Sequence, residues 1–305
     1  MKDRLKPAGK ASLLRLTFSA FLSAALACAV WGQEEQVRFN VSVSVDWLQR
    51  QFSAQASYNL SQAGVKLPTG RLMGEEILKN AYPQLLRPYL LSLRVDSDSV
   101  IKTVVDNGEL SFDDIDSLSI GADKTPLSLS PDLAVMIGRY TIPMEKISAL
   151  FTRHRQAAEP ETPLLPVQTA DYTGIIIIAD RELPVHGRVS GALLEPCIFP
   201  KVWDTNMNLV YEREMSDPGN RESTLVHYAL TETVFRPTPS GLEGELADLL
   251  GSRPLRIIAR GVFGVHPTDP VIDREDALKI LSTDNNRRLL REGRVVLVLN
   301  EKMLK

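Results

Sequence analysis

The chain has 305 residues, of which 44% are hydrophobic and 24% charged, a composition that excludes a disordered chain and a multi-span membrane protein. Its formal charge is −3, but residues 1–32 hold five basic side chains against one acid, so the remainder carries −7. Nucleic acid and anionic lipid are therefore disfavoured as partners, because an acidic chain would release no counterions on meeting either of them.

A secretory signal peptide is predicted at residues 1–32. Basic residues up to Arg15 precede the uncharged run Leu16–Val30, which is short of the ~20 residues that span a bilayer. Cleavage before Gln33 is consistent with the residues that precede it. A chain exported by such a signal peptide is expected to be periplasmic. The alternatives are an uncleaved anchor and lipidation of Cys28 with anchoring to the outer membrane, although Ala25 stands where a lipobox usually has Leu.

An N-terminal domain is predicted over residues 36–155. It opens with two stretches of period two, Val37–Val45 and Phe52–Leu60, which indicate an antiparallel strand pair with one buried face. The pattern then becomes helical after Gly70, and we expect Pro83 and Pro88 to bend or end that helix.

Three further elements complete this domain. The segment 98–108 favours a short helix, with a strand as the alternative. Ser128–Tyr140 is expected to be a strand with Leu133, Val135 and Ile137 on one face. Pro143 suits the start of a final helix, whose end we place at Arg153–Arg155 because cations suit a helix C-terminus.

Residues 156–168 are interpreted as a stiff linker. Pro160, Pro163 and Pro166 recur every three residues, which is the repeat of polyproline II. Since neither the prolines nor the acids between them show an apolar period, we expect this segment to separate two independent cores.

A C-terminal domain is predicted over residues 169–302. Ile175–Ile178 cannot alternate between a wet and a dry face, so it predicts a central strand covered on both sides. The next segments predict a hairpin about Asp204–Met207, a weak helix at Arg221–Thr231, a strand at Leu255–Ala259 and a turn at His266–Pro270. A helical region follows from Asp273 to Gly293, with Asp273 as its N-cap and Asp276 as the partner in a capping box. Val295–Leu299 is expected to be a second buried strand. The chain is thus expected to be α+β, with two mixed α/β domains of antiparallel or mixed sheets packed with helices.

Motifs that would carry chemistry are absent from the sequence. It holds no GxGxxG, P-loop, GxSxG or CxxC, and its four histidines lack the i, i+4 spacing of a zinc pair. His186 lies near Ser190 and Asp180, which permits a triad hypothesis, but a triad is defined by geometry and not by sequence proximity. We predict no catalytic, cofactor-binding or metal-binding residue. Cys197, in an apolar context, is expected to be a buried structural cysteine.

Several segments of the sequence resemble bacterial outer-membrane lipoproteins of the flagellar P type. They are Asp171–Ile175, Pro196–Pro200 with Trp203-Asp204, Leu209–Glu212, Pro254–Ala259, Thr268-Asp269 and Asp276-Ala277, with a looser likeness at Val37–Leu60 and Arg71–His154. The resemblance implies a non-enzymatic envelope protein, such as a ring or disc component around the flagellar motor. The unusual residue at Ala25 departs from those lipoproteins.

These observations predict a secreted, periplasmic, non-enzymatic structural or assembly protein associated with the flagellum. Its partners would be other envelope or flagellar proteins, or copies of itself, and it would meet the membrane only through the signal segment or a lipidated Cys28. The alternatives are an envelope hydrolase that uses His186 and a small-ligand-binding module with its site between the two domains.

Overall fold

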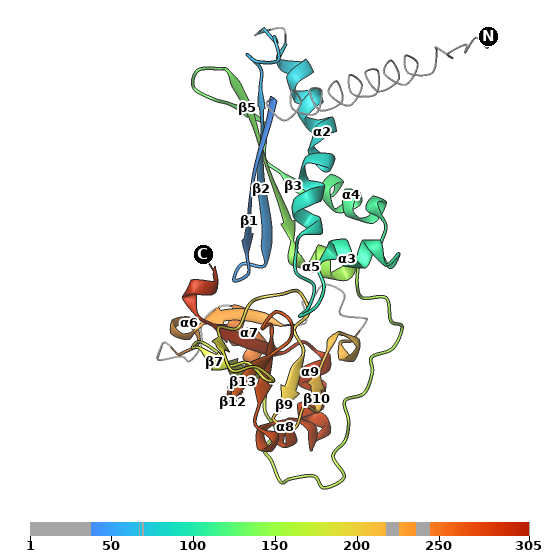
Figure 1. The fold of residues 1–305 in the computed structure, drawn as a ribbon, viewed down its shortest axis with the longest axis vertical. Helices are drawn as coiled ribbons and strands as arrows, with labels where there is room; N and C mark the ends of the chain where they lie inside the picture. Colours follow the sequence, from blue (N-terminus) through green and yellow to red (C-terminus); the bar gives the residue numbers. More distant parts are fainter. Residues whose placement is uncertain (1–37, 67, 69, 218–225, 236–244, 305) are drawn as a thin grey trace, which may run out of the picture. The chain divides into compact units, whose positions relative to one another are not determined.

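Helices and strands make up both halves of the chain in the computed structural model (Figure 1), which describes residues 38–66, 68, 70–217, 226–235 and 245–304. The N-terminal half contains β1 (Phe39–Asp46), β2 (Gln51–Asn59), α2 (Arg71–Leu91), α3 (Ile101–Asp106), α4 (Phe112–Ile120), β3 (Asp123–Lys124), β4 (Ser128–Leu129), β5 (Val135–Pro143) and α5 (Met144–Ala149). The α+β class predicted from the sequence is confirmed.

The C-terminal half carries the remaining elements. They are β6 (Ile175–Ile178), β7 (Leu183–Pro184), β8 (Gly191–Ala192), β9 (Val202–Asp204), β10 (Leu209–Tyr211), η1 (Arg213–Met215), β11 (His227–Leu230), α6 (Thr231–Phe235), α7 (Glu245–Leu250), β12 (Leu255–Ile258), β13 (Gly261–Phe263), β14 (Asp269–Ile272), α8 (Arg274–Leu281), α9 (Asp284–Arg291), β15 (Val295–Leu299) and η2 (Glu301–Leu304).

The chain forms two compact units whose limits cross β1, β2, β5 and α2. The smaller unit holds the residues up to Ser42, Gln55–Asn80 and Pro126–Gly138, and the larger holds Val43–Ala54, Ala81–Thr125 and Arg139–Lys305. The larger unit therefore includes residues from both of the predicted domains. The linker expected at 156–168 contains no helix or strand.

The N-terminal sheet has the order β1-β2-β5-β3, with β4 pairing β5. The period-two expectation is confirmed on β2, where Phe52, Ala54, Ala56 and Tyr58 are all buried. In the smaller unit Gly74 of α2 approaches this layer so closely that a Cβ there would lie 2.7 Å from Leu60. Small residues at this contact let the helix backbone approach the sheet.

Of the two expectations for Pro83 and Pro88, a bend or an end of the first helix, the end is wrong, since α2 continues through both prolines to Leu91. Each proline removes the hydrogen bond to the carbonyl four residues earlier, on Lys79 and Gln84. Both of these residues are exposed, so water can satisfy their carbonyls. The helix is held instead by a buried side chain every fourth residue, at Leu78, Tyr82, Leu86 and Leu90.

The segment expected to be one strand at Ser128–Tyr140 is a hairpin of β4 and β5. Its turn has Leu133 at φ 58, and the Ser130 hydroxyl accepts a hydrogen bond from the Val135 amide. The predicted buried face is also wrong, because Met136 and Tyr140 are buried. The Ser130-Pro131-Asp132 sequence is the turn signal that the strand interpretation overlooked.

The short helix predicted at 98–108 is confirmed as α3, and the final helix begins after Pro143 but ends at Ala149. The sequence interpretation missed α4, which opens with a capping box. The Ser111 hydroxyl accepts from the Asp114 amide, and the Asp114 carboxylate accepts from the Ser111 amide. Substitution Ser111→Ala should therefore lower the free energy of unfolding by about 1 kcal/mol.

Chemical denaturation of the Ser111→Ala variant measures this loss. Ser117, which is exposed on the same helix, offers the matched control, and Ser117→Ala should leave stability unchanged within about 0.5 kcal/mol. Equal losses in both variants would contradict the role given to the cap.

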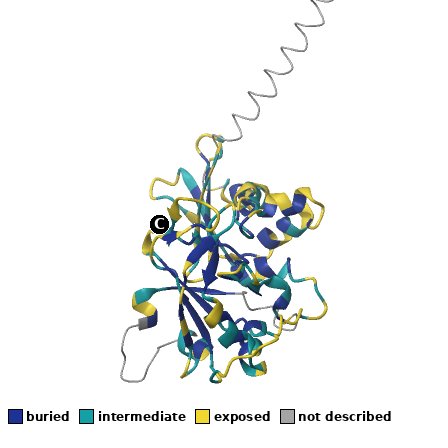
Figure 2. Cartoon of the chain, turned by 60° about the horizontal axis from the view of Figure 1, so that its bottom comes forward, coloured by how far each residue is buried: buried dark blue, intermediate teal, exposed yellow. Residues whose placement is uncertain are grey.

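The main C-terminal sheet confirms Ile175–Ile178 as an interior strand. Its order is β11-β15-β6-β12, and the three pairings are parallel. Ile176 packs with Ala229, Leu250, Val296 and Val298 in a buried cluster, and these strands form the dark blue core of Figure 2. The expected strands at 255–259 and 295–299 are confirmed as β12 and β15.

A second sheet of order β10-β9-β14-β13 lies in the same half, and its β9–β10 hairpin is the predicted one. Two expectations hold only in part or fail here. The turn predicted at His266–Pro270 is confirmed for His266 and Pro267, but β14 begins at Asp269. Pro270 lies opposite Val262 of β13 and precedes the first residue paired with β9. The weak helix at Arg221–Thr231 is contradicted at His227–Leu230, which is strand β11; residues 221–225 lie outside the described ranges.

The helical region predicted from Asp273 to Gly293 is two helices, α8 and α9. Thr283 separates them, and its hydroxyl accepts from the Asn286 amide. Asp273 occupies the N-cap position as expected but makes no side-chain cap bond. Its carboxylate binds Arg260 instead, at 2.6 Å, so the predicted capping box with Asp276 is wrong.

Candidate functional site

The tip of the β1–β2 hairpin reaches the C-terminal half within the larger unit. Arg50, at φ 53, accepts a hydrogen bond from the Met144 amide at its own carbonyl. Its guanidinium lies 3.1 Å from Glu145 and 3.5 Å from Nε2 of His227 on β11. Trp47 adds an edge-to-face contact with Tyr228, with centroids 5.8 Å apart. We call these contacts the hairpin latch.

Burial and the latch both disfavour the protonation of His227. Burial lowers the pKa of this imidazole to about 4, and the nearby charge of Arg50 acts in the same direction. A neutral His227 can accept a hydrogen bond from Arg50, whereas a protonated one would repel it. The latch is therefore suited to neutral pH.

Main-chain hydrogen bonds form a second contact beside the latch. The amides of Ile198, Phe199 and His266 donate to the carbonyls of Arg94, Val95 and Ser97, at 2.7–3.1 Å. Phe199 also meets Phe151 edge to face, with centroids 5.5 Å apart. Because these hydrogen bonds join main-chain atoms, they fix the distance between residues 94–97 and the C-terminal segments with little dependence on side chains. We call the hairpin latch and this second contact together the joint.

A buried polar cluster lies behind the joint in the C-terminal half. The Asp269 carboxylate accepts from the Lys201 amide, the Thr268 hydroxyl and the Trp203 indole. Burial raises the pKa of Asp269 to about 6, and these hydrogen bonds oppose the rise. Cys197 is buried as predicted, and burial raises the pKa of its thiol. An unreactive thiol follows.

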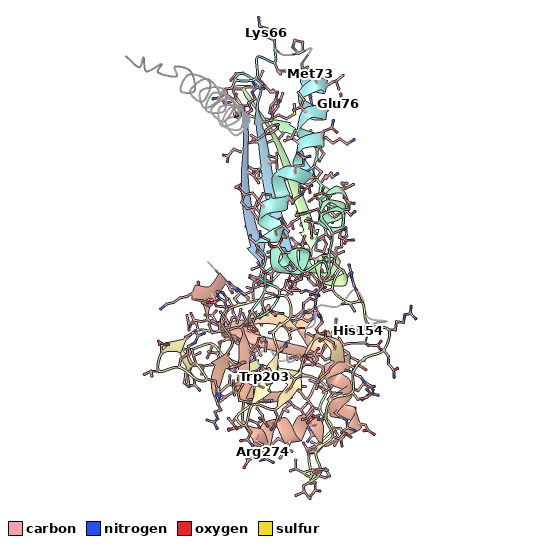
Figure 3. All side chains as sticks on the ribbon, turned by 45° about the vertical axis from the view of Figure 1, so that its right-hand side comes forward. Lys66, Met73, Glu76, His154, Trp203 and Arg274 are labelled. Atoms are coloured by element: carbon pink, nitrogen blue, oxygen red, sulfur yellow. The ribbon has the colours of Figure 1, made fainter. Side chains whose placement is uncertain are left out.

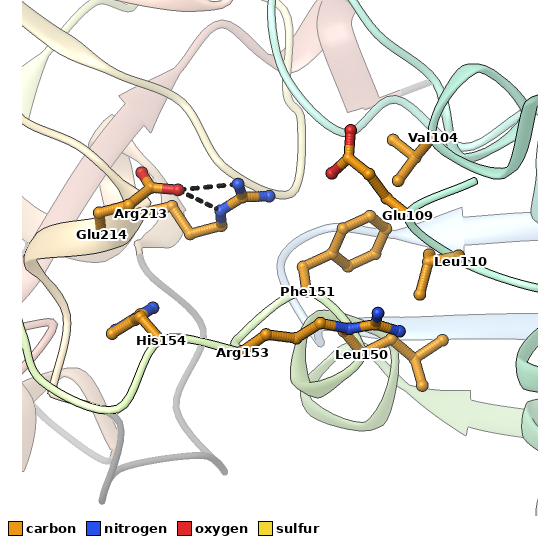
Figure 4. Close-up of a pocket in the computed structure, with 9 residues that line it drawn as sticks. All are labelled: Val104, Glu109, Leu110, Leu150, Phe151, Arg153, His154, Arg213 and Glu214. Carbon is orange, nitrogen blue, oxygen red and sulfur yellow. Dashed lines mark hydrogen bonds and ion pairs between the residues drawn. The ribbon is translucent and has the colours of Figure 1, made fainter. Parts of the chain in front are cut away.

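A pocket of about 240 Å³ opens next to the joint (Figure 4). Its apolar lining comes from α3, the following loop and the end of α5, and its polar lining includes two residues of η1. The apolar residues are Val104, Leu110, Leu150 and Phe151, and the polar ones are Glu109, Arg153, His154, Arg213 and Glu214.

Hydrogen bonds set the directions of the polar groups around this pocket. Nε and Nη2 of Arg213 donate to one oxygen of Glu214, at 3.0 and 2.8 Å. Burial alone would raise the pKa of Glu214, but the hydrogen bond and charge of Arg213 lower it on balance. His154 donates from Nε2 to the Ser216 carbonyl at 2.8 Å, which fixes its tautomer.

A second hollow of about 400 Å³ lies in the larger unit, lined by residues 155–159 and by the end of α9. Its charged lining is largely self-paired, with Arg291 bonded to Glu159 at 2.8 Å and Arg288 to Glu292 at 3.4 Å. Because these charges are already paired within the protein, the second hollow has fewer charged groups available to a ligand than the pocket of about 240 Å³ has.

The structure gives the triad hypothesis little support. His186 lies in the loop between β7 and β8, is exposed, and meets Phe263 edge to face. Asp180 accepts a hydrogen bond from Thr231, and the Ser190 carbonyl accepts from the Val185 amide. No contact joins His186 to Asp180 or to the Ser190 hydroxyl in the part of the chain that the structure describes.

The described residues show neither a metal-binding cluster nor a membrane-spanning helix. Within them, no group of three His, Cys, Asp or Glu side chains could hold a metal ion. None of the helices in these ranges has the length and apolar character to cross a bilayer. Cys28 and the predicted signal peptide lie outside the described residues.

Sequence reasoning missed the pocket. Arg153–Arg155 were interpreted as the charged end of a helix, but α5 ends at Ala149, so these residues belong to an irregular segment that crosses the pocket. The arginine of η1 gave no signal, because nothing in the sequence places Arg213 beside Phe151.

Both halves of the chain match models of known protein families. Residues 38–150 match the model of the N-terminal domain of Treponema pallidum Tp0624, and residues 174–301 match the model of its second domain. No curated protein matches the chain. The predicted two-domain α+β organisation is confirmed, and the two halves of the chain are similar to these two domain families, in that order along the chain.

Proposed function

We propose that this protein, which joins the N-terminal and second domains of the Tp0624 kind, is an exported, non-enzymatic structural or assembly protein of the cell envelope. The observation that carries the proposal is the joint. Arg50, Trp47 and the main chain at Arg94–Ser97 tie the first domain to β11 and to the segment before β9. A joint of this kind suits a scaffold whose two domains must hold a fixed spacing.

The flagellar association is the finer part of the proposal and rests on the sequence resemblance alone. In a cell, the protein would contact other envelope or flagellar proteins, or copies of itself. A deletion strain should therefore show altered flagella or envelope morphology under electron microscopy. Normal flagella and normal motility in that strain would remove the flagellar part and leave the envelope part.

Capture from envelope fractions separates the scaffold from the hydrolase alternative. Tagged wild-type chain and His186→Ala should recover the same partners in the same amounts, because His186 is exposed and outside the joint. Trp47→Ala, which loosens the joint, should recover several-fold less. An envelope-hydrolysing activity that disappears in a folded His186→Ala variant would instead establish an enzyme.

A further inference from the structure

We propose that the pocket beside the joint binds a small zwitterion with an apolar body, namely an apolar α-amino acid or dipeptide. This goes beyond the scaffold role. The volume, about 240 Å³, is below the ~300–1,000 Å³ of common ligand sites, so the occupant must be small. Its floor is buried and apolar, since Val104, Leu110 and Phe151 are each less than 8% exposed.

Two guanidinium groups are placed to receive a carboxylate. Arg213 uses Nε and Nη2 for Glu214, which leaves its Nη1 edge for a second acceptor. Arg153 donates from Nε to the Leu150 carbonyl and lies 3.8 Å from Asp114 through Nη2, so its Nη1 edge is also open. In Figure 4 these side chains lie on either side of the Phe151 ring.

Glu109 decides between an anion and a zwitterion. Its carboxylate belongs to the pocket lining and is drawn over the Phe151 ring in Figure 4. No side-chain ion pair joins it to another described residue, in contrast to Glu214. An isolated carboxylate repels a plain anion and attracts an ammonium. An apolar body with one carboxylate and one ammonium matches the floor, the arginines and Glu109 together.

Titration calorimetry with the full chain tests this assignment. L-Leucine, L-phenylalanine and Leu-Leu are the probes; their N-acetyl derivatives lack the ammonium, and their amides lack the carboxylate. We expect the zwitterions to bind, and each derivative to bind roughly tenfold or more weakly, because a charge-assisted hydrogen bond is lost.

Variants locate the binding. Glu109→Gln should weaken the zwitterion but strengthen the N-acetyl derivative, whose carboxylate Glu109 repels, and Arg153→Gln should weaken both the zwitterion and the N-acetyl derivative by about tenfold. The matched controls are Arg274→Gln and Glu275→Gln on the exposed start of α8, which should bind like the wild type; Figure 3 labels Arg274, and His154 at the pocket.

Each remaining outcome overturns the proposal. N-acetyl derivatives that bind as well as zwitterions would assign the pocket to plain anions. Binding that survives in Glu109→Gln with Arg153→Gln would place the ligand elsewhere. An absence of heat with all three probes up to 10 mM, roughly the weakest affinity such contacts would give, would exclude the amino-acid class. None of these results bears on partner capture, so the scaffold proposal stands or fails separately.

Discussion

Relative to wild type, the Asp269→Asn variant should gain about 2 kcal/mol of unfolding free energy as the pH rises from 4 to 6. Burial raises the folded-state pKa of Asp269 to about 6, so between these pH values the folded state holds a proton that the unfolded state has released. In the wild type, this group therefore costs stability as the pH rises. Asparagine keeps an oxygen acceptor for Lys201 and Thr268 but removes the titration.

The His227→Gln variant should show the opposite slope. The folded-state pKa of His227 is about 4, below its ordinary value of 6.5, so the unfolded state binds a proton first as the pH falls. Wild-type stability drops through this window by about 3 kcal/mol from this group. Relative to wild type, the variant gains that amount as the pH falls from 6.5 to 4.

Urea unfolding at half-unit pH steps measures both slopes. Asp269 and His227 are 1% and 8% exposed, so solvent screening should reduce neither effect much. Asp98, which is exposed, provides the control, and Asp98→Asn should follow the wild type across the range. Parallel curves for all three variants and the wild type would show that neither buried group titrates as described.

A chain cut between Leu164 and Leu165 should remain one particle. These side chains are 99% and 83% exposed, so a protease site inserted there can be cleaved without disturbing a core. The joint then holds the two fragments without a covalent link. They should co-elute in size-exclusion chromatography at micromolar concentration.

The Trp47→Ala variant measures how strongly the joint holds the two fragments together. Trp47→Ala removes the edge contact with Tyr228 and should cost roughly 2 kcal/mol, or about 30-fold in fragment affinity. The control is Leu48→Ala in the same turn, which removes a side chain that is 36% exposed and should leave co-elution intact. If the fragments of the cut chain with no further substitution elute separately, residues 156–168 link two independent bodies, as the proline spacing predicts.

Two strands of the C-terminal sheet could be predicted from the sequence because they are buried along their whole length. Ile175–Ile178 and Val295–Leu299 are covered on both faces, so their apolar runs identify them as strands. The same runs do not state that β15 pairs with β6, because pairing depends on the path of the intervening chain. His227–Leu230 was misread because its strand character comes from its β15 neighbour, and the preceding segment offers no period.

The joint and the pocket were out of reach for a different reason. Arg50, Glu145 and His227 are separated by tens of residues, and each has an ordinary local role when considered alone. Their meeting depends on how the hairpin tip is positioned, which no local pattern encodes. Proline in α2 misled the prediction because helix breaking assumes that the lost bonds are buried, whereas here the affected carbonyls belong to exposed residues.

The strand order of the main C-terminal sheet also constrains when this domain can fold. β15 pairs with both β11 and β6, so an interior position is filled by the last of the four strands to be synthesised. Until residue 299 has left the ribosome, β6 and β11 have no common neighbour, and their apolar edges stay exposed. The second domain therefore cannot complete its main sheet until β15 has been synthesised.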